Sequence, residues 1–167
     1  MEAHGSSLLM ELPPLAIVGG AFLVGLDMVR HERHPGGARA GHLRRRATIL
    51  LLFVASLAHV PVIPAHLKEA PYMGVLFILF TTAAFLLAAV LAARPAPVLY
   101  PVAAVLCAAA VLAYAATRII AFPELADDVG NWTEPLGMVS VAAELGVVLV
   151  STVAARRTVH EVRAEHA

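Results

Sequence analysis

The sequence has little sulfur chemistry and little charge. Cys107 is the only cysteine, so the chain cannot form an internal disulfide bond and has no Cys-x-x-Cys motif. Asp, Glu, Lys and Arg make up 14% of the residues, against about a quarter in soluble domains. Residues 1–11 contain no Lys or Arg, so we do not expect a secretory signal peptide. Lys68 is the only lysine, a bias that, with abundant Ala, Val and Leu, indicates a high-GC bacterial genome.

Motifs of the common enzyme classes are also absent. The chain has no Ser nucleophile motif, no Gly-rich phosphate loop and no His-Glu-x-x-His motif. Asp127 and Asp128 could act as an acid–base pair, but adjacent acids in a loop are usually solvated. Whether the protein is an enzyme is therefore left open, and we expect no nucleic-acid partner.

Long apolar runs are what the sequence does contain. Hydrophobic residues make up 60% of the chain, and its mean hydropathy is +0.80. Crossing about 30 Å of hydrocarbon takes roughly 20 helical residues. The sequence therefore predicts an all-α integral membrane protein, with a five-helix transmembrane domain over residues 1–155 and a basic cytoplasmic tail over residues 156–167. The predicted spans are 12–29, 47–67, 72–93, 98–122 and 135–155.

Arginines determine the expected orientation. With five spans, ten of the twelve basic residues fall on one side, in segment 30–46, at Arg94 and in the tail. Because basic loops stay cytoplasmic, we predict an N-out, C-in multi-pass protein of the plasma (inner) membrane. Its basic inner face would contact anionic lipid. Small residues four apart, such as Ala84 and Ala88, would allow close helix packing within the bundle, in a homo-oligomer or against a membrane partner protein.

The stretch from His59 to Tyr72 carries groups that a membrane span does not need. Pro61 and Pro64 lack the amide hydrogens that a regular helix requires. Seven residues bring His59 and His66 to one helix face, about 10 Å apart. The predicted helix 47–67 is therefore expected to kink near its outer end and to present free carbonyl groups to a cavity.

Glu144 is the most costly residue of the predicted spans. It lies near mid-membrane, where an ionised carboxylate costs about a few kcal/mol unless it is paired, protonated or hydrated. Arg118, near the outer end of the predicted helix 98–122, is the candidate counter-charge. Segment 122–134 is rich in turn formers and acids and could cover the mouth of the bundle. We expect an outward-facing polar pocket that also includes Tyr72, Tyr114, Asp127, Asp128, Asn131, Trp132 and Glu134.

These residue types suit a transition metal. Imidazole binds copper, zinc and iron, and carboxylates complete such sites. The candidate ligands are His59, His66, Glu69 and Glu144. Alternatively, the histidines form hydrogen bonds with carbonyl groups freed at the kink. Haem is a second cofactor option and would need His paired with Met, since both histidines lie on one helix.

Three functions stay open from the sequence. The first is a metal-binding membrane protein. The second is a proton-linked or solute permease-like protein, in which Glu144 and His59 form the polar path, since His titrates near neutrality. The third is an accessory or scaffold subunit that docks a larger complex through its Ala-rich faces.

The metal hypothesis predicts near-stoichiometric copper, zinc or iron in the detergent-purified protein. Elemental analysis by mass spectrometry, with an absorption spectrum of the same samples, measures this directly. The metal should disappear in the His59→Ala/His66→Ala variant, and a Soret band would identify haem. A protein without metal or chromophore, even after reloading, would exclude this hypothesis.

Overall fold

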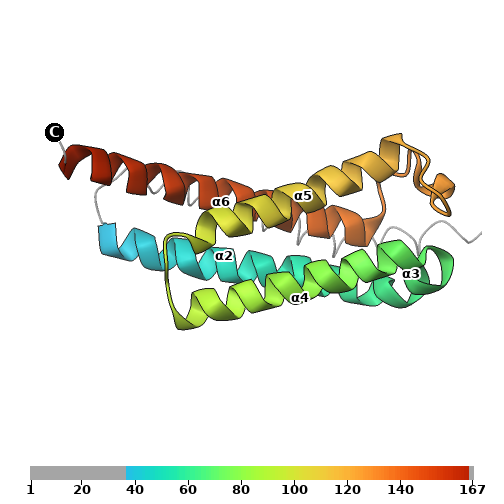
Figure 1. Ribbon diagram of the computed structural model, residues 1–167, viewed down its shortest axis with the longest axis horizontal. Helices are drawn as coiled ribbons and strands as arrows, with labels where there is room; N and C mark the ends of the chain where they lie inside the picture. The colour runs from blue at the N-terminus through green and yellow to red at the C-terminus, as the bar shows by residue number, and fades with distance from the viewer. Residues whose placement is uncertain (1–36, 166–167) are drawn as a thin grey trace, which may run out of the picture.

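The computed structural model describes residues 37–165, and the side chains of residues 41–153. The described chain is all-helical and contains no strand. Its long helices run side by side along the longest axis of the molecule (Figure 1). The elements are α2 (Gly37–His59), η1 (Val60–Val62), α3 (Ile63–Glu69), α4 (Pro71–Ala93), α5 (Leu99–Ile119), η2 (Ala126–Asp128) and α6 (Pro135–Glu165).

Four stretches of these helices are long and apolar enough to cross a membrane. They are Gly41–Glu69, Pro71–Ala93, Leu99–Ile119 and Pro135–Val153. These stretches overlap the last four predicted spans. Predicted span 12–29 lies outside the described residues, so the count of five and the orientation stay predictions. Residues 156–165 of the predicted tail continue α6.

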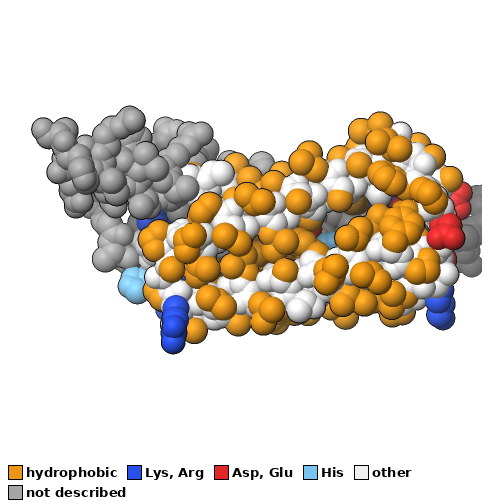
Figure 2. Space-filling model, viewed as in Figure 1, with side chains coloured by type: hydrophobic (Ala, Val, Ile, Leu, Met, Phe, Trp, Pro, Cys, Tyr) orange, Lys and Arg blue, Asp and Glu red, His pale blue; other side chains and the backbone are white. Residues whose placement is uncertain are grey.

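The outside of the bundle is apolar along its length. Figure 2 shows hydrophobic side chains over most of the visible face, and charged side chains gathered near its two ends. Helix α5 is the most exposed: Val105 is 71% exposed and Leu112 is 70% exposed. Side chains of this kind would be costly in water over so large an area but suit contact with lipid.

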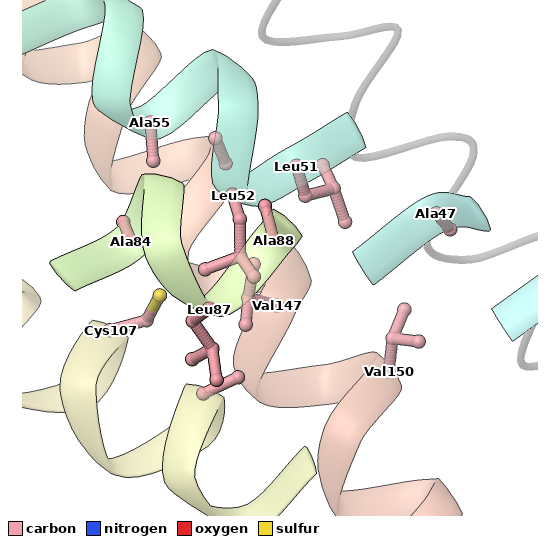
Figure 3. Packing of buried hydrophobic residues seen from close by; sticks show 12 residues of the cluster. Ala47, Leu51, Leu52, Ala55, Ala84, Leu87, Ala88, Cys107, Val147 and Val150 are labelled. Atoms are coloured by element: carbon pink, nitrogen blue, oxygen red, sulfur yellow. The ribbon is translucent and has the colours of Figure 1, made fainter. Parts of the chain in front are cut away.

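Small residues allow the helices to pack closely inside the bundle. Helix α6 packs against both α2 and α5, and α2 also packs against α4. Ala55 of α2, Ala84 of α4, Cys107 of α5 and Ala143 of α6 are fully buried in one cluster. Leucine and valine side chains such as Leu52 fill the remaining space (Figure 3). Close approach of this kind is how membrane helices associate without a hydrophobic driving force.

Prolines determine two of the helix boundaries. Helix α5 ends at Ile119, three residues before the end of the predicted span 98–122. Pro123 has no amide hydrogen to bond the Ile119 carbonyl, and the chain is already extended at Ile120. Around Pro61 the backbone changes to the 3-10 turn η1 between α2 and α3. The predicted change of helix axis at this turn stays a prediction.

Gly74 allows α4 to pack against α3, and its replacement should destabilise the bundle. A Cβ atom at Gly74 would lie 2.7 Å from Leu67 Cγ and 2.8 Å from the Leu67 backbone nitrogen. Because a backbone atom cannot move aside cheaply, Gly74→Ala should cost about 1–3 kcal/mol of stability. Thermal unfolding in detergent measures this cost.

Gly41→Ala is the matched control in another helix. A Cβ atom there would be 3.9 Å from its nearest neighbour, the Arg44 guanidinium. Because alanine favours helix over glycine, we expect a neutral effect or a gain of about 0.5–1 kcal/mol. Equal unfolding temperatures for the two variants would show that Gly74 does not constrain the packing of α3 and α4.

Candidate functional site in the bundle interior

Glu144 lies at the middle of the membrane-spanning part of α6. It is 2% exposed, and the span runs from Pro135 to Val153. The start of α6 is well defined, since the Glu134 carboxylate accepts hydrogen bonds from the backbone amides of Leu136 and Gly137. The side chain of Glu144 is thus enclosed between α6 and the helices packed against it.

A chain of hydrogen bonds connects Glu144 to His59. The Ser140 hydroxyl group donates to Glu144 Oε1 over 2.7 Å. Ser140 lies one turn before Glu144 on α6, and its Oγ is 3.2 Å from Nδ1 of His59 on α2. Nδ1 also lies 2.9 Å from the Ala55 carbonyl oxygen. Because a carbonyl oxygen can only accept, Nδ1 carries the hydrogen and shares it between the Ala55 carbonyl oxygen and Ser140 Oγ, whose own hydrogen goes to Glu144.

Aromatic rings hold both histidines at this end of the bundle. The His59 ring lies 4.9 Å from the Phe77 ring and 4.8 Å from the Phe80 ring, between centroids. Phe77 also contacts His66, at 4.8 Å. His66 Nδ1 is 2.9 Å from the Val62 carbonyl oxygen. Each histidine thus bonds the carbonyl group four residues before it in the chain.

The four candidate metal ligands are not gathered in one place. His59 and Glu144 are linked through Ser140, His66 shares only Phe77 with His59, and Glu69 is exposed. Within the described part of the chain, no three His, Cys, Asp or Glu side chains are placed to hold one ion. The metal site stays a prediction.

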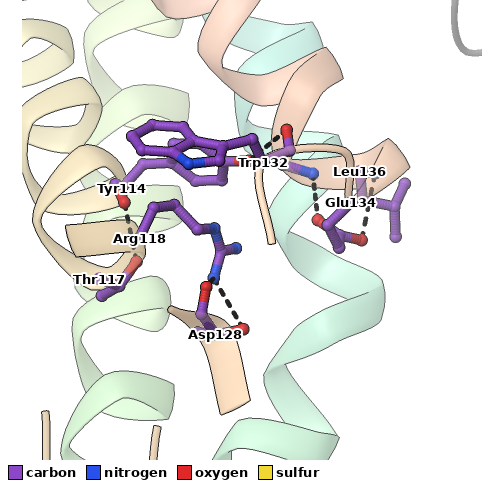
Figure 4. A network of polar contacts seen from close by, with 8 residues as sticks. Tyr114, Thr117, Arg118, Asp128, Trp132, Glu134 and Leu136 are labelled. Atoms are coloured by element: carbon purple, nitrogen blue, oxygen red, sulfur yellow. Dashed lines mark hydrogen bonds and ion pairs between the residues drawn. The ribbon is translucent and has the colours of Figure 1, made fainter. Parts of the chain in front are cut away.

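Arg118 fixes the α5–α6 loop, residues 120–134, to the end of α5. Its Nη1 forms a 2.7 Å ion pair with Asp128 Oδ1, and its guanidinium carbon lies 4.5 Å from the centre of the Tyr114 ring. The Tyr114 hydroxyl group donates to the Trp132 carbonyl oxygen over 3.2 Å. The Gly130 amide donates to the Arg118 carbonyl oxygen over 2.9 Å. Figure 4 shows Arg118 directed at Asp128, with Tyr114 and Trp132 alongside.

The same loop is also tied to the start of α4. The Tyr72 hydroxyl group donates to the Pro123 carbonyl oxygen over 2.7 Å. Leu125 is buried against Ala70 and Met73, and Phe77 packs on this cluster. Since Phe77 also contacts both histidines, the loop is packed next to the His59 end of the hydrogen-bond chain. The loop residues Asp127, Asn131 and Trp132 are exposed.

The predicted pocket residues therefore form two groups. Arg118, Tyr114 and Asp128 hold the loop, and His59 and Glu144 meet in the interior through Ser140. Sequence reasoning missed Ser140, although its position four residues before Glu144 on a helix was a usable signal. A single pocket that joins the two groups stays a prediction.

Comparison with known proteins found no relative of this chain. The sequence matches no protein-family model, and neither the curated proteins nor the solved structures that were searched include a similar chain.

The ion pair between Arg118 and Asp128 should hold the loop in place. Arg118 is 7% exposed and Asp128 is 27% exposed, so the pair is partly shielded from water. Asp128→Asn should weaken the closed loop by about 1–3 kcal/mol, because a buried guanidinium loses its charged acceptor. Hydrogen–deuterium exchange of the amides of residues 120–134 measures this loosening.

Asp127→Asn is the control for the same experiment. It removes one negative charge from the adjacent, exposed position. We expect exchange in this variant to match the wild type. If Asp128→Asn exchanges no faster than Asp127→Asn, the ion pair does not hold the loop.

Proposed function

We propose that this chain is a proton-linked membrane protein, in which Glu144 exchanges protons with the His59 end of the bundle through Ser140. One observation carries the proposal: the hydrogen-bond chain from His59 Nδ1 through Ser140 Oγ to Glu144 Oε1. A fully buried carboxyl group at the middle of a span is costly and suggests a function.

The direction of the hydrogen bonds supports proton transfer toward Glu144. A proton that arrives at Nε2 of His59 allows the Nδ1 hydrogen to move to Ser140 Oγ. The Ser140 hydroxyl hydrogen then moves to Glu144 Oε1. One proton enters at Nε2 of His59 and one is gained by the carboxylate of Glu144, so the protons balance. The Ser140 hydroxyl group recovers by rotation, and the ring recovers its first tautomer when it loses the Nε2 hydrogen and takes up a proton at Nδ1. Imidazole suits the entry position because it takes up and releases protons near neutral pH.

The distribution of basic residues supports an orientation for this path. Arg45 Nε donates to the Leu91 carbonyl oxygen over 3.0 Å, so the arginines at the start of α2 meet the end of α4, next to Arg94. His59 lies at the opposite end of α2. We propose that the arginine end faces the cytoplasm and its anionic lipid, that His59 faces outward, and that the membrane is a bacterial plasma membrane.

Proton flux into liposomes tests the proposed function. The purified protein is reconstituted with a pH-sensitive dye inside, and a potassium gradient with valinomycin supplies the driving potential. We expect flux above that of empty liposomes. Glu144→Gln should lower this flux about a hundredfold, because the amide keeps the shape but cannot exchange a proton. Ser140→Ala should lower it too, because it breaks the chain between His59 and Glu144.

Ser56→Ala is the matched control for Ser140→Ala. Ser56 is fully buried in α2, and its hydroxyl group donates to the Leu52 carbonyl oxygen of its own helix over 2.8 Å. Loss of this local bond should leave the flux unchanged. Wild-type flux in Glu144→Gln would refute the proposal. Metal that is bound by the wild type and absent from the His59→Ala/His66→Ala variant would favour the metal-binding alternative.

A further inference from the structure

Two buried hydroxyl groups, one on α2 and one on α6, have no hydrogen-bond partner in the described part of the chain. They belong to Thr48 and Ser151, and both residues are 0% exposed. The Ser56 and Thr117 hydroxyl groups, by contrast, bond to their own helices: Ser56 donates to the Leu52 carbonyl oxygen, and Thr117 donates to the Tyr114 carbonyl oxygen. A third hydroxyl group without a partner, that of Thr81, belongs to α4. Thr48 and Ser151 lack this local bond, although the same backbone carbonyl groups are within reach in any helix.

Helix geometry places these two hydroxyl groups opposite each other. Thr48 precedes His59 by eleven residues on α2, and Ser151 follows Ser140 by eleven residues on α6. Eleven residues are about three helical turns, so each hydroxyl residue returns to nearly the same face and is displaced by about 16 Å along its helix. The helices are antiparallel neighbours whose faces meet at His59 and Ser140. Thr48 and Ser151 are therefore expected to face the interface between α2 and α6, which we call the α2–α6 seam. They lie nearer the end of the bundle that carries Arg45.

An apolar layer separates this pair from Glu144. Leu52 and Val147 are both 0% exposed and lie between the two depths, in the main core cluster. The seam between α2 and α6 thus has polar groups at two depths with leucine and valine between them. A layer of this kind keeps a polar path closed until water enters it.

We propose that Thr48 and Ser151 bind an internal water molecule, which serves as the inner station of the proton path through the α2–α6 seam. Water fits because a buried site with two hydroxyl groups and nearby helix carbonyl groups offers the two to four partners that it needs. Two neutral hydroxyl groups give no charge to hold a cation instead. The role in the path rests on the proposed function, whereas the binding of water does not.

Water-edited solid-state NMR of the full chain in bilayers tests the water site. Magnetisation should pass from water to the Thr48 and Ser151 side chains much faster than to Ser56, which is equally buried on α2. Thr48→Val, which keeps the side-chain shape, should slow the transfer to Ser151. Transfer to Thr48 and Ser151 as slow as that to Ser56 would overturn the proposal.

Proton flux in the same liposome assay tests the role of this water in the path. The Thr48→Val/Ser151→Ala variant should lose about tenfold in flux, because a station on the path is removed. Ser56→Ala should retain wild-type flux. If Glu144→Gln abolishes flux and Thr48→Val/Ser151→Ala does not change it, the inner station is refuted and the proposed function stands. If Glu144→Gln keeps full flux, the proposed function fails, and the NMR measurement alone decides the water site.

Discussion

The buried carboxyl group of Glu144 is the constraint on which the rest of the bundle depends. At the middle of a span, such a group must be protonated, hydrogen-bonded or hydrated. Here Ser140 supplies the hydrogen bond from one turn away, and His59 of α2 extends it. Helices α2 and α6 can form this contact because the small side chains of Ala55 and Ala143 let the two helices approach closely. Close helix packing and polar chemistry are thus two consequences of the same interface.

The α5–α6 loop connects this interior to the end of the bundle. Arg118 and Asp128 fix the loop to α5, and Tyr72 fixes it to α4. Leu125 packs with Met73, and Phe77 carries that packing on to the His59 ring. The packing of the loop is therefore continuous with that of the His59 ring.

Composition and the length of the apolar runs were sufficient to predict the four long helices of the described residues, because apolar runs of about 20 residues have few alternatives in a membrane. They were less informative about helix ends near prolines: α5 ends at Ile119, and the 3-10 turn η1 interrupts the helix after His59. The sequence singled out His59 and Glu144 because both residues are costly in lipid. It placed both residues on one hypothetical polar path but could not identify Ser140 as their link, since that link depends on the register between α2 and α6, which no local pattern encodes. Arg118 stood out as a charge, but its ion pair with Asp128 depends on the fold of the loop.

Infrared difference spectroscopy of Glu144 tests the central claim most directly. The carbonyl band of its protonated carboxyl group is identified by subtracting the spectrum of Glu144→Gln, while the pH outside bilayer-embedded protein is stepped. A proton path through Ser140 predicts a band that follows the outer pH in the wild type and responds far more slowly in Ser140→Ala. A band that responds equally fast in both proteins, or does not respond to outer pH at all, would contradict the path from His59 to Glu144.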